Sequence, residues 1–240
     1  CYAQLDPDAI AAIDGVNLVI GTNNRSKIVE LVEQLESTER QINAVRDIMK
    51  ESNFEEMPLF GNESDKARAF MKIQEGCNNY CSFCIIPYTR GKLKSRKIED
   101  IVEEAKRLVD HGFHEIVLTG IHLGNYGVEL PGRPTLADVV KALLEIPELY
   151  RIRFGSIESV EVSDELVELM ATDKRVCPNL HLPLQAGSDH VLKLMRRHYT
   201  LQEYKDLIAK LRSRIKDLSI TTDIIAGFPQ ETDEDFEETL

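Results

Sequence analysis

From residue 67 onward, short apolar segments alternate with amphipathic ones, and this alternation constrains the fold more than any other feature of the chain. We predict strands at the apolar segments, which are residues 69–74, 115–119, 151–156, 179–184 and 219–226. We predict helices at the amphipathic segments, which are residues 98–111, 136–144, 164–172, 189–195 and 201–216. Strands separated by such helices pair in parallel through right-handed crossovers. The alternation therefore predicts an α/β fold, and the short, regularly spaced strands favour a partial (βα) barrel of five units over an open sheet.

Residues 1–65 show a different pattern from the rest of the chain. Residues 17–22 form a compact apolar run that is typical of a buried parallel strand, and a helical spacing of apolar residues follows at 26–32. Residues 43–66 are polar and acidic with little periodicity, which indicates a connector. We therefore expect the remnant of an α/β domain plus a linker over residues 1–65, and the partial barrel over residues 66–240.

The composition excludes several classes of protein. The 240 residues carry a formal net charge of −12, which argues against a generic nucleic-acid binder. No apolar run is long enough to span a bilayer, and the start of the chain lacks the basic flank and apolar core of a signal peptide. The five cysteines indicate metal binding in a reducing compartment rather than disulfides, so we expect a cytoplasmic protein without a membrane. Because the chain opens on Cys1 and stops inside an amphipathic run, we expect an internal segment of a longer protein.

Three of the cysteines, Cys77, Cys81 and Cys84, lie within eight residues, directly after the first expected strand. In a βα barrel this is the end of the strands that carries the chemistry. Three thiolates on one tight loop are one ligand short of the four that a 4Fe–4S cluster takes, which leaves one iron open for a substrate or cofactor. A zinc site in a non-catalytic binding module is the main alternative, but such sites usually add a second cysteine pair or a histidine, and residues 85–87 contain neither.

A run of basic residues follows the cysteine loop. Arg90, Lys92, Lys94 and Arg96 place positive potential beside the expected cluster, although the chain as a whole is acidic. They could hold the phosphates of an RNA or help to neutralise an anionic cluster. The alternative is a solvated loop that leads into a helix, with Ser95 as the helix cap.

Polar residues and glycines follow the other expected strands. Thr119 and Gly120 open a loop after the second strand, with His122 as a side chain that could stack on a ligand or donate to it. The glycine spacing of this loop differs from GxGxxG, so no dinucleotide site is predicted. Glu158 and Gln185 follow the third and fourth strands, where a barrel would point them at a bound cofactor.

Together these segments resemble the methylthiotransferase branch of the radical S-adenosylmethionine (SAM) superfamily. The resemblance rests on residues 76–91, Ser95-Arg96, residues 182–185 and residues 227–229. Within the branch, residues 116–127 look most like the members that act on N6-threonylcarbamoyladenosine in tRNA. The start, Cys1-Tyr2-Ala3-Gln4, resembles the end of the branch's N-terminal domain, where a third cysteine completes an auxiliary 4Fe–4S cluster.

The resemblance implies a radical SAM type of partial barrel, truncated at its C-terminal end and preceded by part of the N-terminal methylthiotransferase domain. It implies that Cys77, Cys81 and Cys84 hold the 4Fe–4S cluster that cleaves SAM to a 5′-deoxyadenosyl radical. That radical would remove a hydrogen atom from the modified adenosine next to the anticodon, chemistry that only a cofactor can supply. A second 4Fe–4S cluster, bound in part by Cys1, would deliver a methylated sulfur. The sequence assigns no catalytic residues beyond these ligands and leaves them unknown.

The resemblance also implies where SAM lies. Arg197 resembles the arginine that pairs with the SAM carboxylate in related enzymes. Thr119 and Gly120 stand where many such enzymes have a glycine-rich pair before a glutamate, but no glutamate follows here. The apolar fifth strand would offer a flat surface to the adenine ring. The residues that we expect around the cofactor are Tyr80, Phe83, Thr119, Gly120, Glu158, Gln185, Arg197, Asp223 and Ile225.

The partners implied by the resemblance are a tRNA substrate and an electron donor such as flavodoxin or ferredoxin. The main RNA-binding domain of the branch would lie beyond residue 240, which reconciles the acidic charge with an RNA substrate. With one auxiliary cysteine of three, the segment should not complete the reaction by itself. The alternative substrates are those of sister enzymes, which modify isopentenyladenosine in tRNA or an aspartate of a ribosomal protein.

Overall fold

The computed structural model describes residues 1–38, 40–57 and 67–240. The strands of the predicted βα units are β3 (Ala69–Lys72), β6 (Glu115–Thr119), β7 (Arg151–Phe154), β8 (Asn179–His181) and β9 (Ser219–Thr221). β3, β6 and β7 form one parallel sheet with β6 in the middle, and β8 pairs in parallel with β9. The predicted parallel pairing is therefore confirmed in both sheets.

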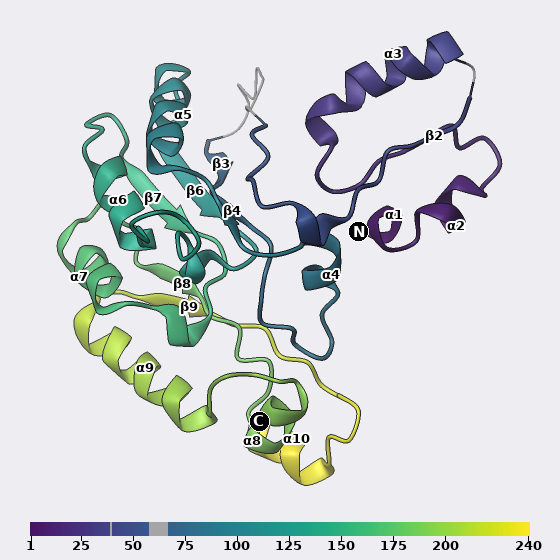
Figure 1. The fold of residues 1–240 in the computed structure, drawn as a ribbon. Coiled ribbons are helices and arrows are strands. Elements are labelled where there is room, and N and C mark those ends of the chain that lie inside the picture. Colours follow the sequence, from purple (N-terminus) through teal and green to yellow (C-terminus); the bar gives the residue numbers. More distant parts are fainter. Residues whose placement is uncertain (39, 58–66) are drawn as a thin grey trace.

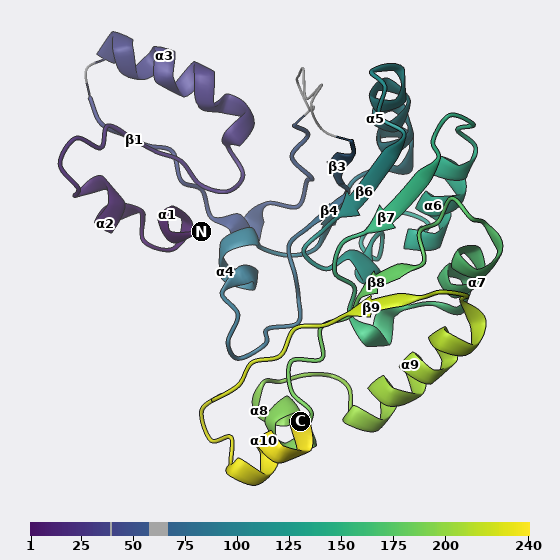
Figure 2. The same ribbon diagram turned by 180° about the vertical axis from the view of Figure 1, so that it is seen from behind.

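Single bridges continue the array from one sheet to the other. Ile152 in β7 bridges to Val176, and Ser156 just after β7 bridges to His181 in β8. The five strands thus follow one another in chain order around a curve, as Figures 1 and 2 show from opposite sides. Among the described residues the array does not close into a barrel. These observations confirm the α/β class and the partial barrel, although some strands are shorter than predicted, and β9 ends at Thr221.

Helices cover the outer side of this array (Figure 1). They are α5 (Ile98–Asp110), α6 (Leu136–Leu144), α7 (Asp164–Thr172) and α9 (Leu201–Arg214), with α8 (Asp189–Leu194) and α10 (Asp233–Thr239) packed together at one end. Side-chain caps fix where four of them begin, and Thr232 forms a capping box with Asp235 at the start of α10. Thr135 and Thr200 each form a capping box with the acidic residue three positions later, and the Ser163 hydroxyl accepts from the Leu166 amide.

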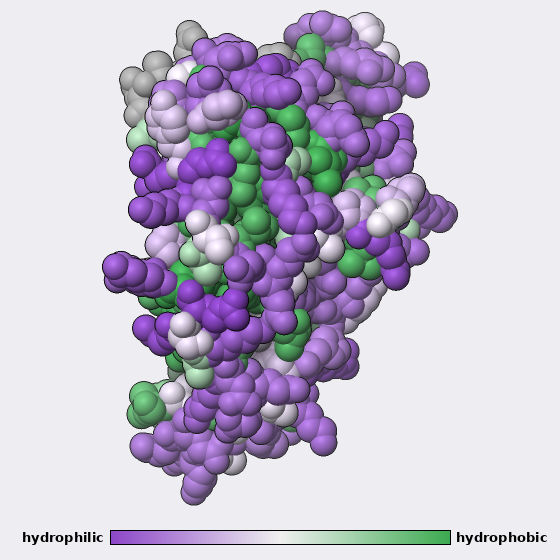
Figure 3. Space-filling model, turned by 90° about the vertical axis from the view of Figure 1, so that its left-hand side faces the viewer, coloured by the Kyte–Doolittle hydropathy of each residue, from purple (hydrophilic) through white to green (hydrophobic). Residues whose placement is uncertain are grey.

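The core lies between the strands and these helices. Ile116 and Leu118 of β6, Ile152 of β7, Leu180 of β8 and Ile101 of α5 are fully buried. Burial of one such side chain contributes about 1.5–3 kcal/mol relative to leaving it exposed. On the face shown in Figure 3, hydrophilic residues cover most of the surface. None of the helices in the described part of the chain combines the length and the apolar character needed to cross a membrane.

A short antiparallel hairpin, which the sequence did not indicate, frames the cysteine loop. β4 (Gln74–Glu75) pairs with β5 (Lys94–Ser95), and α4 (Ile86–Arg90) lies between them. Gly76 has a φ of +78°, and a Cβ atom there would lie 1.9 Å from the Lys92 carbonyl oxygen, so the turn requires glycine.

The expectation that Ser95 caps a helix is wrong. The Ser95 hydroxyl accepts from the Gly127 amide at 2.8 Å, and Lys97 is the N-cap residue of α5. The hairpin explains the difference, because it holds Ser95 in a strand before the helix begins.

The first 57 residues form small elements of their own. These are α1 (Tyr2–Leu5), α2 (Pro7–Ala11), β1 (Leu18–Val19), η1 (Arg25–Lys27), α3 (Ile28–Thr38), β2 (Ile42–Asn43) and η2 (Ile48–Lys50). The parallel β1–β2 pair and α3 confirm the predicted strand and helix. Both α1 and η2 contact α4, so this segment lies beside the hairpin (Figure 1). The proposed domain boundary after residue 65 falls outside the described residues and stays a prediction.

Candidate cofactor site

The cysteine loop is tied to the barrel at both ends. The Cys77 amide donates to the Gly91 carbonyl oxygen at 3.1 Å, which closes the loop on the β4–β5 side. At the other end, the Ser82 amide and hydroxyl donate to the carbonyl oxygens of Met195 and Leu194 at 3.1 and 2.8 Å. All three loop cysteines are free thiols and partly buried. The loop thus spans the space between the hairpin and the end of α8.

A buried histidine lies against Cys77. His122 Nδ1 is 3.5 Å from Cys77 Sγ, and its Nε2 pairs with a Glu161 oxygen that also accepts from Asn125 Nδ2 at 2.7 Å. Burial alone would lower the pKa of His122, but its contacts with Cys77 and Glu161 outweigh burial and raise the pKa to about 10. The ring therefore carries a positive charge toward Cys77. The Asn79 amide adds a donor to the same sulfur at 3.4 Å.

A buried arginine lies against Cys81. Arg197 Nη1 donates to Cys81 Sγ at 3.2 Å, while its Nη2 pairs with Glu158 and its Nε donates to the Tyr199 hydroxyl at 3.2 Å. Its side chain is 3% exposed. Burial raises the pKa of the Cys81 thiol, and Arg197 opposes that shift by favouring the thiolate. Two predicted site residues, Arg197 and Glu158, are thus brought together at Cys81.

The donor set fits an anionic iron–sulfur cluster. Three free thiols share one loop, and a cationic side chain contacts each of Cys77 and Cys81. Within the described residues no three His, Cys, Asp or Glu side chains converge as they would around a single metal ion. A cubane binds each cysteine at a different iron, so its thiolates need not converge on one point.

Three predicted cofactor residues meet at the ends of β8 and β9. Gln185 bridges to Ile224, and the Ile225 amide donates to the Gln185 carbonyl oxygen at 2.9 Å. Asp223 accepts from Gln185 through its backbone, and its carboxylate lies 3.2 Å from His181 Nε2. Gln185 has a φ of +70°, an uncommon conformation for a residue other than glycine. The structure thus places Gln185, Asp223 and Ile225 side by side.

The remaining predicted cofactor residues are more scattered. Phe83 is 42% exposed and packs edge-on against Phe228, with ring centroids 6.3 Å apart. Tyr80 packs edge-on against Tyr88 at 5.8 Å. The Thr119 hydroxyl donates to a carbonyl oxygen of the neighbouring strand at 3.2 Å, which is a contact within the sheet.

A cavity lies beside the cysteine loop. It has a volume of about 130 Å³, and the residues that line it include Asn79, Glu158, Glu161 and Arg197. Glu161 is absent from the predicted site residues because it lies 39 residues from His122 in the chain and follows no strand. Gly120 is closely packed on the neighbouring Gln74, which contacts a Cβ built there at 3.0 Å.

The four basic residues that follow the loop differ in their surroundings. Arg90 donates to Glu75 at 2.8 Å, Lys94 is 3% exposed, and Arg96 is 5% exposed and paired with two glutamates. Lys92 is the exposed member of the set. Phosphate binding by these residues stays a prediction, and Lys92 is the side chain best placed for it.

The remaining predicted ligand, Cys1, lies at the start of α1. Its side chain is exposed, and α1 contacts α4, the helix that follows the cysteine loop. Figures 1 and 2 both show the N-terminus beside α4. Cys1 therefore lies in the segment that packs on α4, and its role as a ligand stays a prediction.

Residues 71–240 match the sequence profile of the Radical SAM superfamily. The threonylcarbamoyladenosine tRNA methylthiotransferase MtaB of Bacillus subtilis (strain 168) is 43% identical, over 100% of this chain and 53% of that protein. The tRNA-2-methylthio-N(6)-dimethylallyladenosine synthase of Thermoanaerobacter sp. (strain X514) is 44% identical, over 94% of this chain and 47% of that protein. The chain thus spans about half the length of these curated relatives.

A solved structure shares the fold. The apo form of the cobalamin-dependent S-adenosylmethionine radical enzyme OxsB superposes with a TM-score of 0.60, covering 100% of this chain and 36% of that chain. The sequences are 14% identical, so this likeness supports the architecture alone.

Proposed function

Because this chain belongs to the radical SAM superfamily, we propose that it carries the SAM-cleaving centre of a tRNA methylthiotransferase. Membership implies a 4Fe–4S cluster and SAM as cofactors. The observation that carries the proposal is the 43% identity to MtaB over the whole chain, including the cysteine loop. The protein would act in the cytoplasm, where its tRNA substrate is found.

The residues of the loop have distinct roles in this proposal. Cys77, Cys81 and Cys84 would hold the cluster through three irons. When bound, the cluster supplies the electron that cleaves SAM and so generates the radical that attacks an unactivated C–H bond. His122 would orient the Cys77 thiolate and offset its charge, since Glu161 fixes the ring from the far side.

The residues beyond the loop would hold SAM. Arg197 has a fixed guanidinium at the loop and would bind the SAM carboxylate, with Glu158 setting its orientation. Gln185, Asp223 and Ile225 would line the adenine side, because they form one surface at the ends of β8 and β9.

We infer that the substrate is N6-threonylcarbamoyladenosine in tRNA, as the name of the MtaB relative states for that protein. A second 4Fe–4S cluster would use Cys1 together with ligands outside this chain, and flavodoxin or ferredoxin would supply electrons. Dimethylallyladenosine is the second candidate substrate, because the Thermoanaerobacter relative is 44% identical.

With either substrate, residues 1–65 would be part of the methylthiotransferase domain plus a linker, and residues 66–240 would be the radical SAM barrel.

Nucleoside analysis of tRNA tests this proposal. The full-length protein is expressed in a host that lacks its own enzymes for both modifications. We expect a 2-methylthio group on N6-threonylcarbamoyladenosine, and none in cells that carry Cys81→Ala, since that change removes a cluster ligand. Cys177→Ala is the matched control, because Cys177 is a buried thiol before β8 and should leave the product unchanged. If the methylthio group appears on dimethylallyladenosine alone, that nucleoside is the substrate. If the wild-type protein forms no methylthio product at all, the proposal is overturned.

A further inference from the structure

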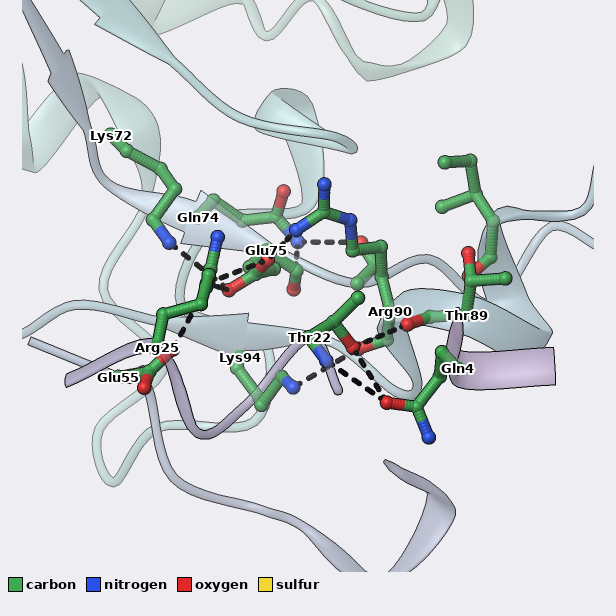
Figure 4. A network of polar contacts seen from close by, with 12 residues as sticks. Gln4, Thr22, Arg25, Glu55, Lys72, Gln74, Glu75, Thr89, Arg90 and Lys94 are labelled. Carbon is green, nitrogen blue, oxygen red and sulfur yellow. Dashed lines mark hydrogen bonds and ion pairs between the residues drawn. The ribbon is translucent and has the colours of Figure 1, made fainter. Parts of the chain in front are cut away.

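A buried carboxylate lies two residues before the first loop cysteine. Glu75 is 3% exposed, and its two oxygens accept from Arg90 Nη1 at 2.8 Å, Lys72 Nζ at 3.1 Å and Arg25 Nη2 at 3.3 Å (Figure 4). The strand partner of Glu75 is Lys94, which is itself buried. One buried carboxylate thus pairs with three partly exposed cations.

The cations come from three separate segments of the chain. Lys72 belongs to β3, and Arg90 ends α4 directly after the cysteine loop. Arg25 belongs to η1 in the N-terminal segment, and it also donates to Glu55 at 3.0 Å. Glu75 is therefore one group that the N-terminal segment, the barrel and the turn after the cysteine loop all contact.

A second set of contacts runs beside the first. The Thr22 hydroxyl donates to the Thr89 carbonyl oxygen at 2.6 Å, and the Gln4 side chain accepts from the Thr22 amide at 3.0 Å (Figure 4). Gly91 packs so closely on the N-terminal segment that a Cβ there would lie 2.6 Å from the Ile48 carbonyl oxygen. These contacts fasten both sides of the turn at Arg90 to residues 4–48.

The arrangement makes the charge of Glu75 necessary for the contact. Arg25, Lys72 and Arg90 would repel one another without the carboxylate between them. A cation that loses its partner is destabilised, and Arg25 is the one of the three that belongs to the N-terminal segment, so losing its pair with Glu75 removes a link from that segment to the loop. The N-terminal segment would then keep its Thr22 and Ile48 contacts but lose its ion pair beside the loop, while the barrel kept its own contacts.

We propose that Glu75 is a positioning residue that fixes the N-terminal segment, which carries Cys1, relative to the loop of Cys77, Cys81 and Cys84. The inference rests on the proposed function for its purpose, because sulfur delivery from a second cluster requires a constant placement of the two ligand sets. The contact itself depends on the described side chains alone.

Hydrogen exchange of the backbone amides in the full-length, cluster-loaded protein tests the contact. Glu75→Gln and Arg25→Gln should each speed exchange at residues 22–27 by about tenfold or more, since a charged hydrogen bond is lost. Exchange in β6 should stay unchanged with Arg25→Gln. Glu103→Gln, an exposed glutamate of α5, is the matched control. If Glu75→Gln does not fold, Arg25→Gln decides the test, because its side chain is partly exposed.

Two outcomes of this experiment would overturn the proposal. One is exchange at residues 22–27 that rises no more than in Glu103→Gln. The other is an even rise over β3, β6 and β7, which would make Glu75 a stabiliser of the barrel only.

A second readout separates this proposal from the proposed function. With Arg25→Gln we expect SAM cleavage to continue, while the amount of 5′-deoxyadenosine formed per methylthiolated nucleoside rises at least about threefold. An unchanged ratio would count against positioning. If the wild-type protein forms no methylthiolated nucleoside, the proposed function fails, and the exchange data still decide whether Glu75 holds the segment.

Discussion

Glu115 shows what one carboxylate contributes at the scale of a residue. It begins β6 and pairs with Arg151 at 2.6 Å and Arg153 at 3.3 Å, both from the neighbouring strand β7. Burial would raise the pKa of Glu115, but hydrogen bonds from the two arginines outweigh burial and hold the pKa below its usual value. The pair therefore links the two strands most strongly when the carboxylate is charged.

The stability of the fold should depend on pH through this residue. A carboxylate with a lowered pKa contributes its full stabilisation above the pKa of the unfolded chain and loses it as the pH falls through the lower folded value. We expect Glu115→Gln to lower the free energy of unfolding by about 1–3 kcal/mol at pH 7, and by much less at an acidic pH below the lowered folded-state pKa of Glu115. Urea titrations at the two pH values measure this. A loss of equal size at both, or one matched by Glu103→Gln, would contradict it.

Among single residues, the sequence could predict those whose signal is local spacing, but not those whose partners are distant in the chain. Cys77, Cys81 and Cys84 were found because their spacing is local, and the structure places cationic groups on two of them. The partnership of His122 with Glu161 depends on two loops that meet only in the folded chain. Likewise, the pairing of Arg96 with Glu104 cannot be seen in a run of basic residues, because burial and partner choice are set by tertiary packing.

At the scale of elements, the five βα strands and their helices were predictable because each carries a clear apolar period. The hairpin of β4 and β5 was not predictable from the sequence. Each of its strands has only two polar residues, which show no apolar alternation, and the two strands are joined by the long connection of residues 76–93. The early ends of β7, β8 and β9 have a related cause. Past these ends the pairing continues only as single bridges, Ser156 to His181 and Gln185 to Ile224, so no regular ladder extends to the predicted ends.

Gly76 gives a prediction at this scale. Gly76→Ala adds a Cβ that would meet the Lys92 carbonyl oxygen at 1.9 Å, in addition to the strain of a positive φ. Gly132→Ala is a matched control with the same φ of +78° and open space around it. We expect Gly132→Ala to cost about 1 kcal/mol of stability and Gly76→Ala clearly more. Thermal unfolding and iron content after reconstitution measure both effects, and equal losses would show that the close contact is unimportant.

At the scale of the whole molecule, charge is distributed unevenly. The chain carries a net charge of −12, and the basic residues Arg90, Lys94 and Arg96 are largely buried and compensated from within. Little positive charge therefore remains around the cysteine loop for an external polyanion.

The exposed Lys92 allows a test of this view. In the full-length protein, Lys92→Gln should reduce the slope of log affinity for tRNA against log salt concentration by about 0.7–0.9, the value for one phosphate contact. Arg96→Gln should lower thermal stability and leave that slope unchanged, because Arg96 is buried against Glu104. Filter binding over a range of salt concentrations measures the slopes. An equal change in both variants, or none in Lys92→Gln, would assign the RNA contact elsewhere.

The β4–β5 hairpin also bears on the entropy of cofactor assembly. Its hydrogen bonds bring the two ends of residues 76–93 together through contacts of the protein alone. Closing a flexible loop has an entropic cost that grows with the logarithm of its length, and here folding of the protein meets that cost in advance. A cluster that binds the loop would therefore need to order only the short stretch between its ligands. Its affinity would be higher than for an open chain, because the entropy of closing the loop is not lost on binding.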